Sequence, residues 1–554
     1  MDYLKFDIES CKDCYSCLRH CPVKAIKFVN NKAEIIEDKC ILCGNCVNVC
    51  PQNAKKVISS IDFVKNLIKN HPQKVALSVA PSFISNFDVV SFDAFKKAAS
   101  QLGFSIVEET ARGAQYVTEE YGRILDKNVH KSFITTACPA VNTFICLNYP
   151  SAIKYLAPIV SPMVAHGRIL KKEYGDDLHI VFVGPCIAKK KEAIESHVID
   201  CALSFEEFNE MLQEKSISFE DIEDKGSSHN LSRYYPIHRG IIKSFNKLNS
   251  NYDTISVDGV QEIKNILENI DDLENVFIEM NMCDGGCING PMKISTKPKM
   301  KDNSIVRHYV KNSKYIDEEK KVQVDLSTTF KPLDNNHKIP SEEEIKKILA
   351  HIFKYKKEDE INCGACGYNT CREKAIAVYN GLADPEFCMP YLKNKAESIS
   401  NEIIQHTPNG IITINDKGVL IDVNERAFEY LQINKTAVGH FYQEYIDLPE
   451  LLIAIDKKEN IKSVIVYNDK TNKYFDVSIT VVSEHNVAFA IYKDVTQEIL
   501  NDEKMKQLRQ EMIKVTDQVI NKQMAAVQEI ASLLGESTAE AKIALVNFKN
   551  SLKD

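Results

Sequence analysis

The chain has 554 residues, of which 44% are hydrophobic and 26% charged, and its formal net charge is −8 at pH 7. This length predicts several domains of ordinary globular composition, and the acidic balance argues against a general nucleic-acid-binding surface. The chain shows no basic start followed by an apolar run and no run of about 18 apolar residues, so we expect no secretion signal, no membrane span and a cytoplasmic location.

Cysteine is unusually frequent, with 18 residues in the chain. Dense cysteines in a reducing compartment indicate metal binding or catalysis, because disulfides are disfavoured there. Eight lie in the first 50 residues, six between residues 138 and 287, and four between residues 363 and 388. This clustering predicts separate sites in separate domains.

Residues 1–56 contain two copies of the pattern C-x2-C-x2-C-x3-C-P. They resemble a bacterial two-cluster ferredoxin, in which the fourth cysteine of each run binds the other cluster. Such a domain would carry electrons one at a time, and two zinc sites are the less favoured alternative. The pattern predicts one [4Fe–4S] cluster on Cys11, Cys14, Cys17 and Cys50 and a second on Cys40, Cys43, Cys46 and Cys21.

Residues 57–350 carry three further cysteine motifs, each directly after an apolar run typical of a strand. They are TTACPAVN with Cys138, VGPCIAKKKEA with Cys186, and EMNMCDGGCINGPM with Cys283 and Cys287. Strand ends can meet at one edge of an open α/β sheet, so these four thiols can converge on one [4Fe–4S] cluster. The long separations do not by themselves establish a metal site.

The three motifs resemble the signature segments of the [FeFe] hydrogenases, over roughly residues 75–300. The resemblance implies that the four cysteines bind a [4Fe–4S] subcluster. It also implies that Cys287 bridges to a diiron subsite with CO, cyanide and azadithiolate, which completes the H-cluster. Protons and H2 interconvert at that cofactor. The stretch Ala80, Pro81 and Ser82 is similar to the turn that contacts the cofactor in this family.

Several side chains are expected to hold this cofactor. Lys189 and Ser82 would donate hydrogen bonds to its anionic cyanide ligands. Gly285, Gly286 and Gly290 would let the backbone pack against it. For Lys190 and Lys191 we expect only a solvated helix face.

The chain departs from the family pattern at three positions. Ala137 stands where efficient members carry a cysteine that relays protons, and alanine has no proton to give. Gly184 and Asn281 replace methionines that usually lie near the cofactor. Such changes tune a metal site without removing it and are characteristic of the sensory members of the family. They predict an enzyme that binds H2 but turns over slowly.

The residues that would replace the missing cysteine are left open by the sequence. Four glutamates in VEETARGAQYVTEEYG could form a carboxylate chain, although on a helix most would be exposed. Two further thiols, Cys146 and Cys201, are expected to be small buried apolar side chains. The four glutamates are Glu108, Glu109, Glu119 and Glu120.

A fourth cysteine group lies in residues 351–395, with the spacing C-x2-C-x4-C-x16-C. It resembles the small iron–sulfur domain found in corrinoid proteins and beside hydrogenases. A further [4Fe–4S] cluster is favoured over zinc, because three other clusters are expected in the same chain. The ligands would be Cys363, Cys366, Cys371 and Cys388.

Residues 396–497 alternate apolar and polar residues around the turn sequence NDKG, which predicts short strands. The region is similar to a PAS domain, a five-stranded sheet with helices on one face. Its only candidate metal ligands are His406, His440 and His485, so no cofactor is assigned.

Residues 498–554 are predicted to be helical, with apolar residues at alternating spacings of three and four. The stripe favours a homodimer seam over a helix packed on its own PAS-like domain. Gly535 would end the first helix, and the capping box Ser537–Glu540 would begin another. The stripe consists of Met505, Leu508, Met512, Val515 and Val519, continued after a one-residue shift by Ile520, Met524, Val527, Ala531 and Leu534.

The sequence thus predicts a multidomain α/β and α+β protein, and three functions stay open. The favoured one is a sensory [FeFe] hydrogenase that signals through its PAS-like domain to a separate output protein. The second is a catalytic hydrogenase with a regulatory tail, which exchanges electrons with ferredoxin or another one-electron carrier. The third is a non-catalytic iron–sulfur scaffold that serves in cluster assembly. H2 and protons would be the substrates of the first two, and no nucleic-acid or membrane partner is expected.

Overall fold

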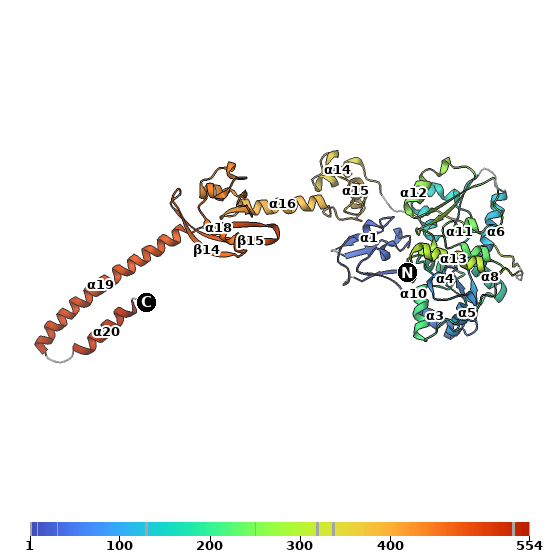
Figure 1. Cartoon of the computed structure of the whole chain (residues 1–554), viewed down its shortest axis with the longest axis horizontal. Coiled ribbons are helices and arrows are strands. Elements are labelled where there is room, and N and C mark those ends of the chain that lie inside the picture. The colour runs from blue at the N-terminus through green and yellow to red at the C-terminus, as the bar shows by residue number, and fades with distance from the viewer. Residues whose placement is uncertain are drawn as a thin grey trace. The chain divides into compact units, whose positions relative to one another are not determined.

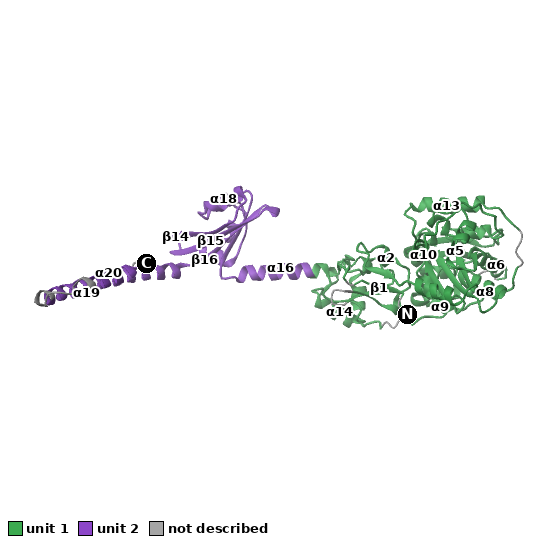
Figure 2. Ribbon diagram, turned by 90° about the horizontal axis from the view of Figure 1, so that it is seen from below, with its two compact units in different colours: residues 1–391 green, residues 392–554 purple. Residues whose placement is uncertain are grey.

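The computed structural model describes residues 3–7, 9–29, 32–127, 131–249, 251–316, 321–334, 338–534 and 538–552. These residues form two compact units, 1–391 and 392–554 (Figure 2). None of the described helices is long and apolar enough to cross a membrane.

The first part of unit 1 is a small fold with an internal repeat. Strand β1 (Leu4–Phe6) pairs with β4 (Lys55–Val57), and β2 (Ile26–Val29) pairs with β3 (Lys32–Ile35). A short helix contains the third cysteine of each run: α1 (Ser16–Arg19) and α2 (Asn45–Asn48). The repeat extends to single bonds, because the N–H of Ala25 donates to Cys21 Sγ and the N–H of Ala54 donates to Cys50 Sγ.

A four-stranded parallel sheet forms the larger core of unit 1, in the order β6-β5-β8-β9. Its strands read as almost unbroken apolar runs, because helices cover a parallel sheet on both faces. The strands are β5 (Val75–Val79), β6 (Ile106–Glu109), β8 (His179–Gly184) and β9 (Cys201–Ser204). The surrounding helices are α3 (Ile61–Asn70), α4 (Phe83–Asn86), α5 (Phe92–Leu102), α6 (Ala111–Lys127), α8 (Pro162–Tyr174), α10 (Phe205–Glu214), α11 (Gly240–Lys243) and α13 (Lys299–Asn312).

A second, three-stranded parallel sheet has the order β10-β11-β7. The predicted α/β class is confirmed, but the cysteine motifs follow strands of two sheets and not of one. Both sheets direct the carboxyl ends of these strands to the same site. The elements of the second sheet are β7 (Phe133–Ile134), β10 (Asp253–Asp258) and β11 (Val276–Asn281), with α7 (Pro139–Asn148), α9 (Ala188–Ser196) and α12 (Val260–Glu268).

The fourth cysteine group lies in a small helical domain at the end of unit 1. Helix α14 (Glu342–His351) packs through Ile345 and Leu349 against Ala375 of α15 (Cys371–Tyr379). The predicted boundary after residue 350 therefore separates a helix from the domain on which it packs.

Unit 2 contains a five-stranded antiparallel sheet in the order β13-β12-β16-β15-β14, so the predicted number of strands is confirmed. Figure 1 labels strands β14 and β15 of this sheet. Helices α17 and α18 pack on it through apolar side chains. The predicted boundary at 395/396 falls inside α16 (Met389–His406), which begins in unit 1. The other elements are β12 (Gly410–Asn415), β13 (Leu420–Val423), α17 (Glu425–Leu431), α18 (Pro449–Lys457), β14 (Ile461–Asn468), β15 (Lys473–Val482) and β16 (Val487–Asp494).

The tail is helical, as predicted. It comprises α19 (Thr496–Leu534) and α20 (Thr538–Ser551), which an ion pair between Lys549 and Asp517 joins. Gly535 and Ser537, together with the side chains of Ala531 and Leu534, lie outside the described residues.

Candidate functional site

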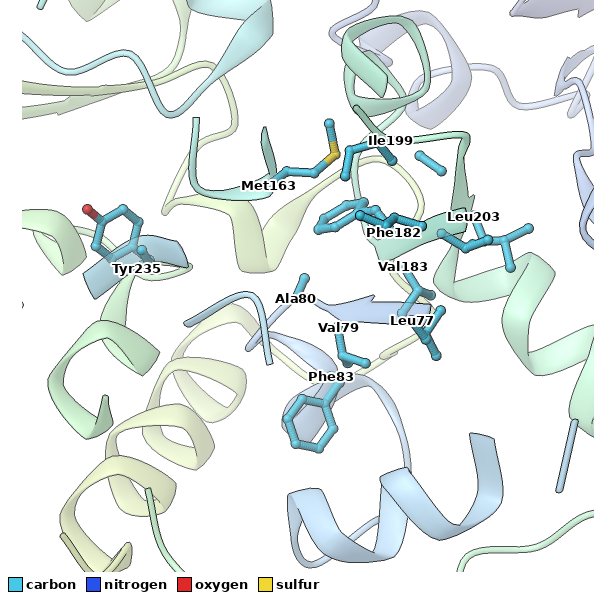
Figure 3. Close-up of a cluster of buried hydrophobic side chains, with 14 of the residues drawn as sticks. Leu77, Val79, Ala80, Phe83, Met163, Phe182, Val183, Ile199, Leu203 and Tyr235 are labelled. Carbon is cyan, nitrogen blue, oxygen red and sulfur yellow. The ribbon is translucent and has the colours of Figure 1, made fainter. Parts of the chain in front are cut away.

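One cavity of about 100 Å³ lies where the strands of both sheets in unit 1 end. Its wall takes residues that follow β5, β6, β7, β8 and β11. Figure 3 shows Ala80 at the end of β5 with Met163, Phe182 and Tyr235 around it, and all four line the cavity. Carboxyl ends of parallel strands are the usual place for ligands in open α/β sheets.

The four cysteines of the central motifs all line this cavity. Burial raises the pKa of each thiol, that of Cys186 to about 11. The negative charges of neighbouring cysteines raise it further at Cys186, Cys283 and Cys287. Thiols in this setting stay protonated unless a cation compensates their charge, which iron does. In the part of the chain that the structure describes, no three His, Cys, Asp or Glu side chains gather around a single ion. The four thiols instead border a shared space, which fits a cofactor of several atoms.

Two polar side chains expected near the cofactor also line the cavity. Ser82 is 1% exposed, and its buried hydroxyl has no hydrogen-bond partner among the described residues. Lys189 donates to the carbonyl of Ala137 over 3.3 Å and to Glu192 over 2.6 Å. A buried hydroxyl without a partner is costly, so Ser82 fits a site that receives an acceptor from a bound group. Ala80 and Pro81 belong to the same wall.

Of the three residues that depart from the expected family pattern, Ala137 and Asn281 line the cavity and Gly184 does not. Ala137 presents a methyl group to the cavity. Asn281 also lines it, and its amide donates to Asp258 over 3.1 Å. At Gly184 a side chain would meet the ring of Phe182 at 2.8 Å, so the packing of Phe182 depends on this glycine.

The glycines of CDGGCING mainly bring backbone segments together. Gly286 has a φ of +93°, and a side chain there would come within 2.6 Å of the carbonyl oxygen of Pro236. Gly285 has a φ of +82°, which also favours glycine. Gly290 lines the cavity and abuts the carbonyl of Pro185, whereas Gly285 and Gly286 are not among the lining residues.

The prediction of a solvated Lys190 is wrong. Its side chain is buried and its ammonium donates to Glu207 over 2.8 Å, to Ser60 Oγ over 2.9 Å and to the carbonyl of Ile58 over 3.1 Å. The run of three lysines gave no sign of this, because the partners lie far away in the sequence. Lys191 is partly exposed and faces Glu195 on its own helix.

The expectation for the four glutamates fails for the first two. Glu108 and Glu109 end strand β6 and are not helical, and Glu109 is buried beside Arg233. Glu119 and Glu120 lie on α6 and pair with Lys321 and Arg123. Cys146 and Cys201 are buried thiols, as predicted.

Glu279 is a feature to which the sequence analysis gave no role. It is fully buried in β11, and its carboxylate accepts hydrogen bonds from the N–H groups of Gly240 and Ile242. Burial and the charge of Asp258 outweigh these bonds and raise its pKa to about 7. A charged residue inside the apolar run NVFIEM is the signal that could have indicated it.

The ferredoxin-like part reaches the cavity directly. Leu42 and Cys43 form part of its wall, and Cys43 contributes to the negative field on Cys283. Around Cys43 the charges of Cys21, Cys46 and Cys40 follow burial in raising its pKa. These are the four residues predicted to share one cluster.

The fourth cysteine group also surrounds a common space. Its four thiols line a cavity of about 20 Å³ together with two buried lysines, Lys354 and Lys374. The Lys374 ammonium donates to the carbonyls of Pro385 and Phe387, which brackets the segment leading to Cys388. Buried positive charge beside four thiolates suits an anionic iron–sulfur group.

This small domain packs against the ferredoxin-like part. The ring of Tyr15 stacks on Phe28 at 3.9 Å and on Phe387 at 3.7 Å. A side chain at Gly367 would come within 2.7 Å of Leu18. Lys24 lies in the field of both Cys21 and Cys366, so the two cysteine groups are electrostatic neighbours.

The histidines of unit 2 do not gather into a site. His406 lies on α16 and pairs with Glu402, whereas His440 and His485 are exposed on separate segments.

Three family descriptions match the chain, all within unit 1. "Iron only hydrogenase large subunit, C-terminal domain" matches residues 73–251 and 238–291. "4Fe-4S dicluster domain" matches residues 3–51, and "Putative Fe-S cluster" matches residues 359–390. The first match contains the cavity-lining cysteines, and the other two contain the remaining cysteine groups.

Two curated relatives share the central region. Iron hydrogenase 1 of Clostridium pasteurianum is 25% identical over 58% of this chain and 75% of its own length. A cytosolic Fe-S cluster assembly factor of Yarrowia lipolytica is 24% identical over 34% of this chain and 45% of its own length. A solved [FeFe]-hydrogenase HydA1 variant from Chlamydomonas reinhardtii covers 46% of this chain and 88% of its own at 14% identity and a TM-score of 0.36. From the family matches and the convergence of the four cysteines, the chain carries an [FeFe]-hydrogenase-like domain behind a 4Fe–4S ferredoxin-type domain.

Proposed function

We propose that the protein is a sensory [FeFe] hydrogenase. It reacts reversibly with H2 at an H-cluster held by Cys138, Cys186, Cys283 and Cys287. Electrons pass through [4Fe–4S] clusters to the small domain, and the redox state is reported through the sheet of unit 2, a PAS domain.

One observation carries the proposal: four buried or partly buried thiols, an ammonium and a hydroxyl without a partner among the described residues border the same cavity. When bound, the cofactor would supply the reversible cleavage of H2. Ser82 and Lys189 would donate hydrogen bonds to its anionic ligands, and the charge on Lys189 strengthens such a bond. Apolar walls that include Met163, Phe182 and Ile241 exclude water from the reacting centre.

The sensory assignment rests on Ala137 and on the domains beyond the cavity. A methyl group cannot move a proton, so turnover is expected to be slow. Cys43 is an electrostatic neighbour of Cys283 in the cavity, and Cys21 is a neighbour of Cys43. Cys21 and Cys366 of the small domain both act on Lys24, so the three cysteines offer electrons a route from the cavity to the small domain. Cys388 directly precedes α16, which continues into unit 2. A change of cluster charge at that point is a local electrostatic event that can bias a neighbouring element.

A dimer would complete the signalling unit. The side chains of Met505, Leu508, Met512, Val515 and Val519 on α19 are each at least 50% exposed in the single chain. A regular exposed apolar stripe on a long helix favours pairing with a second copy. The output protein would be a separate chain.

The iron–sulfur scaffold is the second candidate, since the assembly-factor relative matches the same region. The two functions differ in what the cavity must hold. A plain [4Fe–4S] cluster offers no cyanide ligand to accept from Ser82 and Lys189, so it leaves the buried hydroxyl without a partner. A fast catalytic hydrogenase is the third, and its rate separates it from the sensory protein.

Infrared spectroscopy of the full chain, matured and purified without oxygen, tests the proposal under argon and then under H2. We expect CO and cyanide stretching bands that shift under H2, and their loss in the Cys287→Ala variant. The Cys146→Ala variant is the control, because this buried thiol lies outside the cavity wall and should leave the bands intact. If the matured chain contains iron and sulfide but shows no CO or cyanide bands, the hydrogenase function is wrong and the iron–sulfur scaffold is favoured.

A further inference from the structure

A continuous row of hydrogen bonds leaves the cavity through the four-stranded sheet. Thr110 follows β6 and lines the cavity, and its hydroxyl lies 2.7 Å from Ser78 Oγ on β5. Ser78 Oγ lies 2.8 Å from His166 Nδ1 on α8. The other ring nitrogen, Nε2, lies 3.3 Å from Glu108 Oε2. The row thus consists of four side chains, which come from β5, from β6 and the residue after it, and from α8.

The inner members of the row are buried and its end is not. Ser78 and His166 are 0% exposed and Thr110 is 4% exposed. The Glu108 side chain is 20% exposed and also accepts a hydrogen bond from the half-exposed Tyr174 over 3.1 Å. The row therefore links the interior of the cavity to solvent. Both ring nitrogens of His166 have partners, one toward the cavity and one at the solvent-exposed end of the row.

The positions of α6 and α8 hold the histidine in place. The two helices lie side by side (Figures 1 and 2). A side chain at Gly113 of α6 would come within 2.7 Å of the backbone nitrogen of His166, so this glycine permits the close approach. The ring then reaches Ser78 on one side and Glu108 on the other.

The four groups have the chemistry that proton transfer requires. A hydroxyl and a neutral imidazole each offer one donor and one acceptor. A proton that arrives at Thr110 Oγ1 displaces the hydroxyl proton to Ser78, and Ser78 passes its own to His166 Nδ1. His166 then releases the Nε2 proton to Glu108, which returns it to water. One proton enters and one leaves, and reversal of the sequence carries protons inward.

Neighbouring charged groups keep Glu108, at the solvent end of the row, ionised. Arg112 donates to Glu108 over 3.0 Å and pairs with Glu173. The buried His229 lies within the electrostatic reach of Arg112, His166 and Glu108. Burial raises the pKa of Glu108, but the contacts with His166 and Arg112 outweigh it and lower the pKa to about 2. Glu108 is therefore the ionised group at the solvent end of the row, and a proton that reaches it passes on to water.

We propose that Thr110, Ser78, His166 and Glu108 form the proton path between the cavity and solvent, in place of the thiol absent at Ala137. The path rests on the proposed reaction with H2. Glu119 and Glu120 of α6 are not part of it, since Glu119 pairs with Lys321 and Glu120 with Arg123.

The test compares variants of the matured full chain by infrared bands and by the rate of exchange between D2 and solvent protons. Thr110→Val keeps the shape and removes the hydroxyl, and His166→Gln removes the relay ring. We expect unchanged bands but exchange slowed by at least about tenfold, since a positioned proton-transfer group contributes about 10²–10⁴-fold. Thr110→Ser restores a hydroxyl and should retain most of the rate, which a packing role of the methyl group would not predict.

Ser78→Ala and Ser132→Ala form a matched pair of buried serines. Ser132 is 1% exposed and donates to the carbonyl of Leu273, away from the row. Only Ser78→Ala should slow exchange. Intact bands with wild-type exchange in Thr110→Val and Ser78→Ala would overturn the path alone. Absence of bands in the wild-type chain would overturn the proposed function and the path with it.

Discussion

Ala137 presents a methyl group to the cavity in the position where a thiol could pass protons. A cysteine side chain titrates near pH 8.5 in model peptides, so it can take up and release a proton near neutrality. Alanine has no proton to exchange, and a serine hydroxyl passes a proton only when it has hydrogen-bond partners on both sides. We expect Ala137→Cys to raise the rate of H2 turnover by about tenfold or more if proton delivery limits it. Ala137→Ser, which adds a hydroxyl of similar size, should give much less.

The measurement is H2 turnover with a one-electron dye, at equal infrared band intensity in the three proteins. Equal rates in wild type and Ala137→Cys would contradict a proton-limited reaction. The slow step would then lie in electron transfer or in the binding of H2.

Glu279 makes a second residue-scale prediction, on stability. Its pKa is raised to about 7 in the folded protein, mainly by burial, from an ordinary value of 4.5. The folded state therefore holds this proton more tightly than the unfolded state, and stability is lost as pH rises from about 4.5 to 7. The loss amounts to roughly 3 kcal/mol across this window.

Glu279→Gln has no such titration. The unfolding midpoint of Glu279→Gln minus that of the wild type should therefore increase between pH 5 and pH 7 and stay constant above pH 7.5. Thermal unfolding of the two proteins over this pH range measures the difference. A constant difference at every pH would show that the carboxyl is ionised throughout.

The sequence motifs indicated residues that line one cavity, but they did not indicate the surroundings of these residues. The four central cysteines, Ser82 and Lys189 line one cavity, because short local motifs carry them and strand ends place them together. The environment of Lys190 depends on Glu207 and Ile58, which are distant from it in the sequence. A local sequence pattern cannot indicate such contacts. The row from Thr110 to Glu108 escaped notice for the same reason, since Ser78 and His166 are 88 residues apart.

At the scale of elements, Lys190 anchors helix α9 to the start of α10 and to the linker before α3. Its ammonium meets Glu207, which caps α10, and the carbonyl of Ile58. Removing one partner of a buried ion pair leaves an uncompensated charge and typically costs about 3–5 kcal/mol. We expect Lys190→Met to lower the unfolding midpoint strongly.

Lys191→Met provides the control on the same helix, because its ion pair with Glu195 is solvated and the change should stay within about 0.5 kcal/mol. Addition of Glu207→Gln to Lys190→Met should recover part of the loss by removing the unpaired charge. Thermal unfolding of the full chain gives all three values. Equal midpoints for Lys190→Met and Lys191→Met would mean that the buried pair contributes nothing.

The division into two sheets shows where element prediction reaches its limit. The apolar runs before Cys138, Cys186 and Cys283 are strands, as their patterns predict. Their partners in the sheet could not be predicted, because parallel pairing joins strands across long crossovers that leave no local signal. The sequence pattern indicated a helix at Glu108 and Glu109. In the structure they end strand β6, and the helix α6 begins at Ala111.

At the scale of the molecule, the proposed signal runs from the cavity through three cysteine groups to α16. Each contact along unit 1 joins regions that the sequence presents as independent domains. Tyr15 stacks on Phe387, and Cys43 forms part of the cavity wall. In the proposed function, an electron that leaves the cavity would cross these contacts to reach the cysteine group that directly precedes α16.

The stripe on α19 carries the last prediction, which concerns the number of chains. Met512 is 64% exposed at its centre, and burying such side chains between two helices contributes about 1.5–3 kcal/mol for each one fully buried. Met512→Glu would place a charge in the seam and should raise the dissociation constant of the dimer by at least about tenfold. Gln510→Glu adds the same charge on the opposite face of the helix and should leave the dimer intact.

Sedimentation of the full chain over a range of concentrations measures the three dissociation constants. If Met512→Glu and Gln510→Glu weaken the dimer equally, charge repulsion and not the stripe governs association. A wild-type chain that stays monomeric at high concentration would contradict the seam. The exposed side chains would then serve as the docking face for the output protein, because an apolar stripe of this length on a long helix remains a site of pairing.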